Sequence, residues 1–187
     1  MLIEIRWHGR GGQGAVTASN LLAKAASYEN LWAQSMVFFG AERRGAHVFA
    51  YTRISDNVIK YHHYVHKPDY VIVLSPQLID QYNVTSGLKE NGTIIINYSG
   101  DKSKIKERYN SKWKIAVVDA TQIAIDLDLL VAGIPVVNTI MLGAFSKVSG
   151  VPKIEFVEKA IREFWTGEIA EKNVKGAVEA YKKVNII

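Results

Sequence analysis

Apolar runs alternate with segments of helical spacing along the first part of the chain. Leu2 to Trp7 mixes β-branched and aromatic residues, and Ala15 to Ser27 repeats small and apolar residues at helical intervals. Leu31 to Phe39 and His47 to Ile54 are strand-like again and flank the polar loop GAERRGA. This pattern predicts a strand, a helix and two further strands.

A second series of strands and helices follows. Asp69 to Leu74, Thr93 to Asn97 and Lys114 to Val118 are short and almost continuously apolar, as strands covered on both faces are. PQLIDQY (76–82) predicts a helix with proline in its first turn. The alternation indicates an α/β protein with a Rossmann-like open, mostly parallel sheet, helices on both faces and right-handed crossovers.

The last third of the chain is predicted to be helical. Helical spacing covers Asn138 to Val148, Ile154 to Trp165 and about Glu171 to Val184, with Gly167 expected to close the second helix. No internal repeat or low-complexity linker interrupts the sequence, so residues 1–187 are predicted to form a single domain.

Composition narrows the class of protein. Apolar residues make up 48% and charged residues 22% of the chain, as in ordinary globular proteins. Apolar runs are too short to cross a bilayer, and Met1 leads directly into a strand-like segment rather than a signal peptide. We therefore expect a cytoplasmic protein with no membrane partner.

Charge and cysteine content exclude further classes. The net charge is +5, but the lysines are scattered, and the basic stretch Asp101 to Lys114 fits an exposed helix and loop, so nucleic acid is not a predicted partner. The chain has no cysteine. It can form neither disulfides nor the usual cysteine-ligated iron–sulfur and structural zinc sites.

The stretch RWHGRGGQG (6–14) contains four glycines between the first strand and the first helix. Gly9, Gly11 and Gly14 match GxGxxG, a context in which N–H groups at a helix N-terminus hold a phosphate or another anion. A dinucleotide site also needs an acidic residue after the second strand, where this chain has residues 34–36, QSM. NAD is therefore not a predicted ligand.

A P-loop is excluded as well, because Ala15 and Val16 stand where lysine and serine or threonine would hold phosphate and magnesium. No catalytic or metal-binding residue is predicted. His62, His63 and His66 in YHHYVH lack a supporting carboxylate pattern and are interpreted as an exposed strand end or turn.

Two interpretations of the glycine loop stay open. In the first, the glycines serve only a tight turn and close helix packing. In the second, the loop binds an anion together with a basic loop that follows the second strand at the same edge of the sheet. Adjacent arginines suit phosphates or a partner's carboxylates. The candidate binding residues are Gly9, Gly11, Gly12, Gln13, Gly14, Arg43 and Arg44.

Seven motifs together resemble one family. GRGGQG, AVTASNLLAKAA, GAERRGAHVFAYTRIS, PDYVIVLSP, GLKENGTIIIN, VDATQIA and VVNTIMLGAFSKVSG follow one another as in the gamma subunits of the 2-oxoacid:ferredoxin oxidoreductases, with the pyruvate enzyme as the nearest member. The resemblance covers most of residues 3 to 165. YHHYVHK departs from the family pattern, so no role is carried over to its histidines.

The resemblance implies a complex that oxidatively decarboxylates a 2-oxoacid, with pyruvate expected, to acyl-coenzyme A and CO2 while reducing ferredoxin. Thiamine diphosphate, Mg²⁺ and iron–sulfur clusters are expected on the alpha, beta and delta, or fused, subunits. The family's thiamine diphosphate signature is absent here, because Gly100 and Asp101 are followed by Lys102. The isolated chain is expected to be inactive.

With the redox cofactors on other subunits, the resemblance implies two roles for this chain. One is assembly of the complex, and the other is binding of the substrate coenzyme A through its anionic phosphates. Trp32, Phe38, Phe39 and Trp165 are candidates for buried contacts with other subunits. The alternative function is a stand-alone Rossmann-type module that binds a nucleotide or another small ligand. Co-purification with stoichiometric partners would separate the two.

Overall fold

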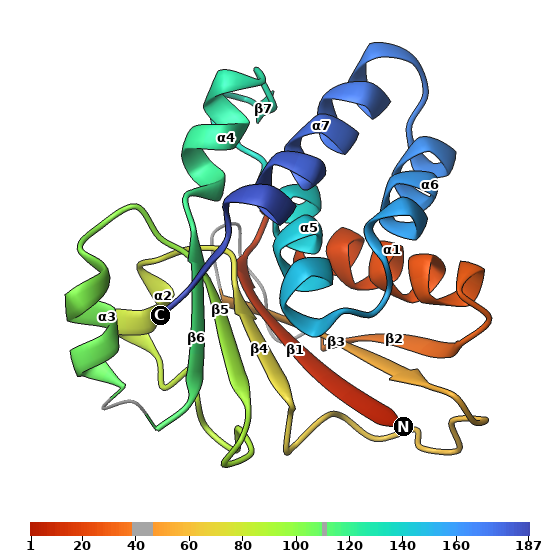
Figure 1. The fold of residues 1–187 in the computed structure, drawn as a ribbon, viewed down its shortest axis with the longest axis vertical. Coiled ribbons are helices and arrows are strands. Elements are labelled where there is room, and N and C mark those ends of the chain that lie inside the picture. The colour runs from red at the N-terminus through yellow and green to blue at the C-terminus, as the bar shows by residue number, and fades with distance from the viewer. Residues whose placement is uncertain (39–46, 110–111) are drawn as a thin grey trace.

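The computed structural model describes residues 1–38, 47–109 and 112–187. A central seven-stranded sheet has the order β2-β3-β1-β4-β5-β6-β9 (Figure 1). Its strands are β1 (Leu2–Arg10), β2 (Trp32–Phe38), β3 (His47–Ser55), β4 (Tyr70–Val73), β5 (Thr93–Asn97), β6 (Lys114–Val118) and β9 (Asn185–Ile186).

Helices cover both faces of this sheet. They are α1 (Ala15–Tyr28), α2 (Leu78–Gln81), α3 (Lys102–Arg108), α4 (Ala120–Asp126), α5 (Asn138–Ser149), α6 (Ile154–Phe164) and α7 (Gly167–Lys183). A short hairpin of β7 (Leu130–Val131) and β8 (Ile134–Pro135) separates α4 from α5. Within the described ranges, no helix has the length and apolar character that crossing a membrane requires.

The predicted α/β class is confirmed, with antiparallel pairing at both edges of the sheet. Strands β1, β4, β5 and β6 pair in parallel, whereas β3 is antiparallel to β1 and to β2, and β9 is antiparallel to β6. The connection 39–46 between β2 and β3 is too short for a parallel crossover, which needs a dozen or more residues. β3 therefore runs antiparallel to β2, and it lies between β2 and β1 in the sheet.

Successive side chains of each strand point to opposite faces of the sheet, so the core consists of two layers. Trp7 and Ile54 face the larger cluster, where α1 and the C-terminal helices pack, with Phe145 of α5 against Trp7. Val71 and Ile94 face the smaller cluster, which α2 and α3 cover. Figure 1 shows the thick helical layer on one side of the sheet and the thin layer on the other. Buried strands explain the continuous apolar runs.

Most predicted elements are confirmed to within a residue or two. The exceptions are β1, which ends at Arg10 instead of Trp7, and α7, which begins at Gly167 instead of near Glu171. Gly167 adopts a φ of +64°, a conformation that glycine reaches without steric cost, and so the chain turns from α6 directly into α7. Gly167 therefore starts the last helix, and the prediction that it closes the preceding one is wrong.

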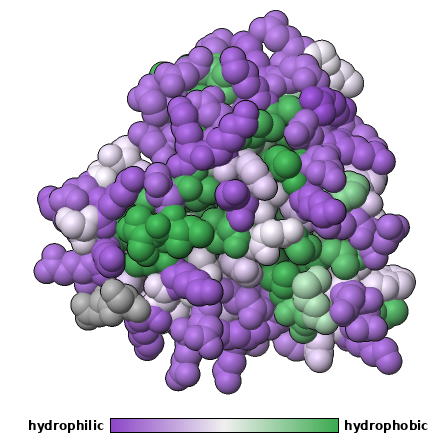
Figure 2. Space-filling model, viewed as in Figure 1, coloured by the Kyte–Doolittle hydropathy of each residue, from purple (hydrophilic) through white to green (hydrophobic). Residues whose placement is uncertain are grey.

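Apolar side chains also reach the surface. Leu130, Val131 and Ile134 of the β7–β8 hairpin are 42%, 65% and 55% exposed, and Ile186 of β9 is 66% exposed. Figure 2 shows apolar areas at the top of the view, where the hairpin lies, and at the left near the C-terminus. Exposed patches of this kind are typical of surfaces that contact other proteins.

The aromatic residues suggested as contact residues differ in exposure. Trp32 and Phe38 are 53% and 40% exposed. Trp165 is partly buried and packs against the larger core cluster. Phe39 lies outside the described residues. Of the three candidates that the structure describes, the two β2 residues thus have the exposure that a contact with another subunit would use.

Candidate functional site

The glycine loop joins the end of β1 to the start of α1 and is closed by Gln13. The Arg10 N–H donates to Gln13 Oε1 at 2.8 Å, and the Gln13 N–H donates to the Arg10 carbonyl at 2.9 Å. Gly12 and Gly14 have φ angles of +96° and +78°, which favour glycine. The side chain of Gln13 therefore holds the turn, and the turn itself accounts for two of the glycines.

Two further features of the loop concern close packing. A Cβ at Gly9 would lie 3.1 Å from Ala15 Cβ, and one at Gly14 would collide with the side-chain amide of Asn138. Asn138 is the first residue of α5, so Gly14 brings the N-termini of α1 and α5 together. Helix N-termini carry partial positive charge, and this junction suits an anion.

The outer surface of the loop is open. Gly12 is exposed, and nothing lies within 4 Å of the position that its Cβ would take. Gly11 is partly exposed beside it. The first residue of α1 to bond within the helix is Ala18, whose N–H donates to the Gly14 carbonyl. The preceding N–H groups of the first turn are the orphan donors that a helix N-terminus offers to an anion.

The sheet register fixes the two ends of the connection that contains the basic loop. Arg10 pairs with His47, and Phe38 pairs with Phe49 at the same edge. Both ends of the connection 39–46 therefore lie at the edge that carries the glycine loop, as the sequence predicts. The candidate residues Arg43 and Arg44 themselves lie outside the described residues.

A cavity of about 420 Å³ lies at the same edge, on the face of the sheet opposite α1. Arg6 and His8 of β1 line it together with His47 of β3. Sequence analysis missed this cavity. The signal available was the polar alternation of Glu4, Arg6, His8 and Arg10 along an otherwise apolar strand, which directs four polar side chains to one face.

Arg6, His8 and His47 form a chain of hydrogen bonds. Arg6 Nε–H donates to His8 Nε2 at 2.9 Å, and His8 Nδ1 lies 3.0 Å from His47 Nε2. Because the guanidinium always carries its protons, His8 must accept at Nε2 and donate from Nδ1. His47 then accepts at Nε2 and bears its own proton on Nδ1. Both imidazoles are held neutral in defined tautomers.

Burial and the nearby positive charge explain the titration of this pair. Burial, then Arg6 and His47, hold the pKa of His8 well below its ordinary value. Burial and Arg6 lower the pKa of His47 to about 4. Both effects disfavour the imidazolium form. The two histidines are therefore neutral donors and acceptors at neutral pH.

We expect acid to destabilise the chain below about pH 6.5, the ordinary pKa of histidine. The unfolded chain takes up protons at His8 and His47 there, whereas the folded chain does not until the pH approaches about 4. Stability is thus complete above this range and falls as the pH falls through it. Denaturant unfolding at a series of pH values measures the slope, which should be smaller in His47→Phe. If the unfolding free energy of His47→Phe depended on pH as steeply as that of the unmodified chain, His47 would not contribute to the acid destabilisation.

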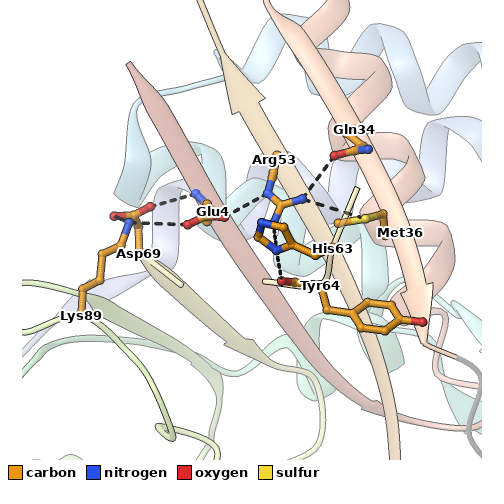
Figure 3. Close-up of polar contacts among 8 residues, drawn as sticks. All are labelled: Glu4, Gln34, Met36, Arg53, His63, Tyr64, Asp69 and Lys89. Atoms are coloured by element: carbon orange, nitrogen blue, oxygen red, sulfur yellow. Dashed lines mark hydrogen bonds and ion pairs between the residues drawn. The ribbon is translucent and has the colours of Figure 1, made fainter. Parts of the chain in front are cut away.

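The YHHYVH segment lies between β3 and β4, with His62, His63 and His66 exposed, as expected. It covers a buried ion pair shown in Figure 3. Arg53 is fully buried, and its Nε donates to Glu4 Oε1 at 2.9 Å. His63 approaches the same guanidinium at 3.4 Å. Across residues 1–38, 47–109 and 112–187, no three His, Cys, Asp or Glu side chains gather as a metal ion would require.

The chain is similar to known proteins over nearly its whole length. The family model described as pyruvate ferredoxin/flavodoxin oxidoreductase matches residues 4–183. The chain is 49% identical to the pyruvate/ketoisovalerate oxidoreductases common subunit gamma of Thermococcus litoralis, over 97% of each chain. It is 47% identical to pyruvate synthase subunit PorC of Methanocaldococcus jannaschii, over 98% of this chain and 97% of that one.

A solved structure is similar over the same length. The crystal structure of the pyruvate oxidoreductase subunit PORC of Thermotoga maritima aligns with a TM-score of 0.86 at 34% identity. The alignment covers 99% of this chain and 98% of that one.

Proposed function

Because the chain belongs to the pyruvate ferredoxin/flavodoxin oxidoreductase family and is a gamma subunit of a 2-oxoacid:ferredoxin oxidoreductase complex, we propose that it completes the assembled enzyme and helps to bind coenzyme A. The match extends over nearly the whole chain and over nearly the whole length of the relatives. This favours the subunit over a stand-alone nucleotide-binding module.

The proposed division of labour leaves the redox chemistry to other chains. Pyruvate would lose CO2, pass its acyl group to the thiol of coenzyme A and release its electrons to ferredoxin. Thiamine diphosphate, Mg²⁺ and the iron–sulfur clusters would reside on the alpha, beta and delta, or fused, subunits. The absence of cysteine supports this, because cluster ligation uses cysteine thiolates.

Contact with those subunits would use the exposed apolar residues. The β7–β8 hairpin presents Leu130, Val131 and Ile134, and β2 presents Trp32 and Phe38. Lasting assemblies bury large apolar interfaces, commonly about 2,000 Å² or more. We propose that partner subunits cover these two surfaces.

Coenzyme A binding would use the junction of α1 and α5. The observation that carries this proposal is the open outer surface of the glycine loop, where Gly12 is exposed above two converging helix N-termini. Backbone N–H groups there suit a phosphate of coenzyme A. Arg43 and Arg44 belong to the connection between β2 and β3, whose two ends lie at the same edge, and would add charged contacts.

Gly12→Ala in the assembled complex should raise the Michaelis constant for coenzyme A by about tenfold, because the methyl obstructs approach to the loop. The matched control is Gly150→Ala at the end of α5, where φ is +74° and nothing lies within 4 Å of the added Cβ. Both substitutions should cost about 1 kcal/mol of stability through backbone strain. Only Gly12→Ala should change coenzyme A kinetics. An equal Michaelis constant for coenzyme A in the two variants would show that the loop only forms a turn and does not bind coenzyme A.

The double substitution of Arg43 and Arg44 with glutamine tests the basic loop in the same assay. Charged hydrogen bonds are worth about 1.5–3 kcal/mol each, so loss of one phosphate contact should raise the Michaelis constant by about tenfold or more. Unchanged kinetics combined with weaker assembly would instead assign the arginines to subunit docking. Size-exclusion chromatography of the complex measures assembly independently of turnover.

A further inference from the structure

The two helix N-termini that meet at the glycine loop are not capped by side chains. Gly14 precedes α1 and Val137 precedes α5, and neither residue has a side-chain oxygen that could accept an N–H of the first turn. Asp101 and Asp119, in contrast, cap α3 and α4. The first turns of α1 and α5 also contain no acidic residue. The positive ends of these two helices are therefore not neutralised by their own side chains.

Asn138, the first residue of α5, adds a side-chain donor to this junction. It is 3% exposed, and its Oδ1 accepts the N–H of Thr139 at 2.8 Å. This bond orients the amide so that Nδ2 is the atom nearest to the position that a Cβ at Gly14 would take. An amide nitrogen can only donate. The two N–H groups of Nδ2 therefore lie where α1 and α5 meet.

This donor is accessible to a ligand. Among the described residues, the side-chain atoms that are sealed from solvent without a hydrogen-bond partner are His47 Nδ1 and Tyr109 Oη. Asn138 Nδ2 donates to no atom of the described ranges and is not one of these sealed atoms, so it keeps contact with solvent. In Asn173, another buried amide of the α5–α7 pair, both amide atoms are paired. A largely buried amide with an open donor is suited to holding a ligand.

We propose that Asn138 is a binding residue of the glycine-loop site, with Nδ2 donating to a phosphate oxygen of coenzyme A. This role rests on the proposed binding of coenzyme A at the loop and adds a side chain to it. The first-turn N–H groups of both helices and the Asn138 amide would then bind the same phosphate. Gly14 has a part in this arrangement, because any Cβ at that position would displace the amide.

Asn138→Asp in the assembled complex tests this role. The variant keeps the size of the side chain and the oxygen that accepts the Thr139 N–H, but it replaces the donor with a negatively charged acceptor. The Michaelis constant for coenzyme A should rise about tenfold or more, while kcat at saturating coenzyme A stays unchanged, because the lost contact is one of binding. If Asn138→Asp does not assemble, Asn138→Ala removes the donor without adding charge and should raise the Michaelis constant about fivefold.

Asn173→Asp is the matched control, since it makes the same change in a buried amide whose Nδ2 donates to the carbonyl of Ile169 at 2.8 Å. It should lower stability without changing the Michaelis constant for coenzyme A. An equal rise in Asn173→Asp and Asn138→Asp would assign the effect to disturbed packing of α5 and α7 and would overturn the role of Asn138.

Gly12→Ala separates the role of Asn138 from the site itself. If Gly12→Ala raised the Michaelis constant and neither Asn138 variant did, the loop would still bind coenzyme A, but Asn138 would not contact it. If none of these variants raised the constant, the proposed site at the loop would fall together with the role of Asn138. Isothermal titration calorimetry of coenzyme A with each complex gives the affinity independently of turnover.

Discussion

Gly143→Ala should destabilise the chain by about 1–3 kcal/mol, the usual cost of overpacking a well-packed core. Gly143 lies in α5 where this helix crosses α7, and an added Cβ would collide with the backbone carbonyl of Ala177. No rotamer relieves a contact with backbone, so the two helices must move apart. In a chain of this size the midpoint of thermal unfolding should fall by several degrees, at about 2–4 °C per kcal/mol.

Gly176→Ala in α7 is the matched control for this prediction. Its added Cβ would lie 2.9 Å from Ile140 Cγ1, an atom of a side chain that can shift. Alanine is also favoured over glycine within helices by about 1 kcal/mol, which offsets part of the strain. We expect a clearly smaller loss than in Gly143→Ala. A Gly143→Ala chain as stable as the unmodified protein would show that α5 and α7 do not cross this closely.

Arg53→Met should cost about 3–5 kcal/mol, the effect of removing one partner from a buried ion pair. Arg53 is fully buried, while the side chain of Glu4 is 16% exposed. Without Arg53, the nearest described cation to Glu4 is Lys89, whose Nζ lies 3.8 Å from Oε2 (Figure 3). The carboxylate would then stay largely buried without adequate compensation. Denaturant unfolding of the full chain measures the loss.

Two further variants test that explanation. The double variant Glu4→Gln with Arg53→Met removes both charges and should recover much of the stability, because no uncompensated ion remains. Arg108→Met removes an exposed arginine that pairs with Asp80 at 2.8 Å, and exposed pairs are worth only about 0–1 kcal/mol. A loss in Arg53→Met as small as in Arg108→Met would mean that the Glu4 charge is solvated in its absence.

Local patterns were sufficient for most of the elements. The strands at Thr93–Asn97 and Lys114–Val118 match their predicted bounds, because a strand buried on both faces leaves a continuous apolar run in the sequence. The glycine loop was likewise recognisable, since its turn depends on residues close in sequence. Its possible ligand was not, because GxGxxG spacing is shared by turns that bind nothing.

Long-range pairing and the properties of the polar side chains came only from the tertiary structure. Gly14 lies against Asn138, Arg53 pairs with Glu4, and Arg6 reaches the carbonyl of Val84, contacts between residues far apart in the chain. No local pattern specifies such partners, because register and packing arise when the whole sheet assembles. The low pKa of His47 has the same origin, since burial and the charge of Arg6 exist only in the folded chain.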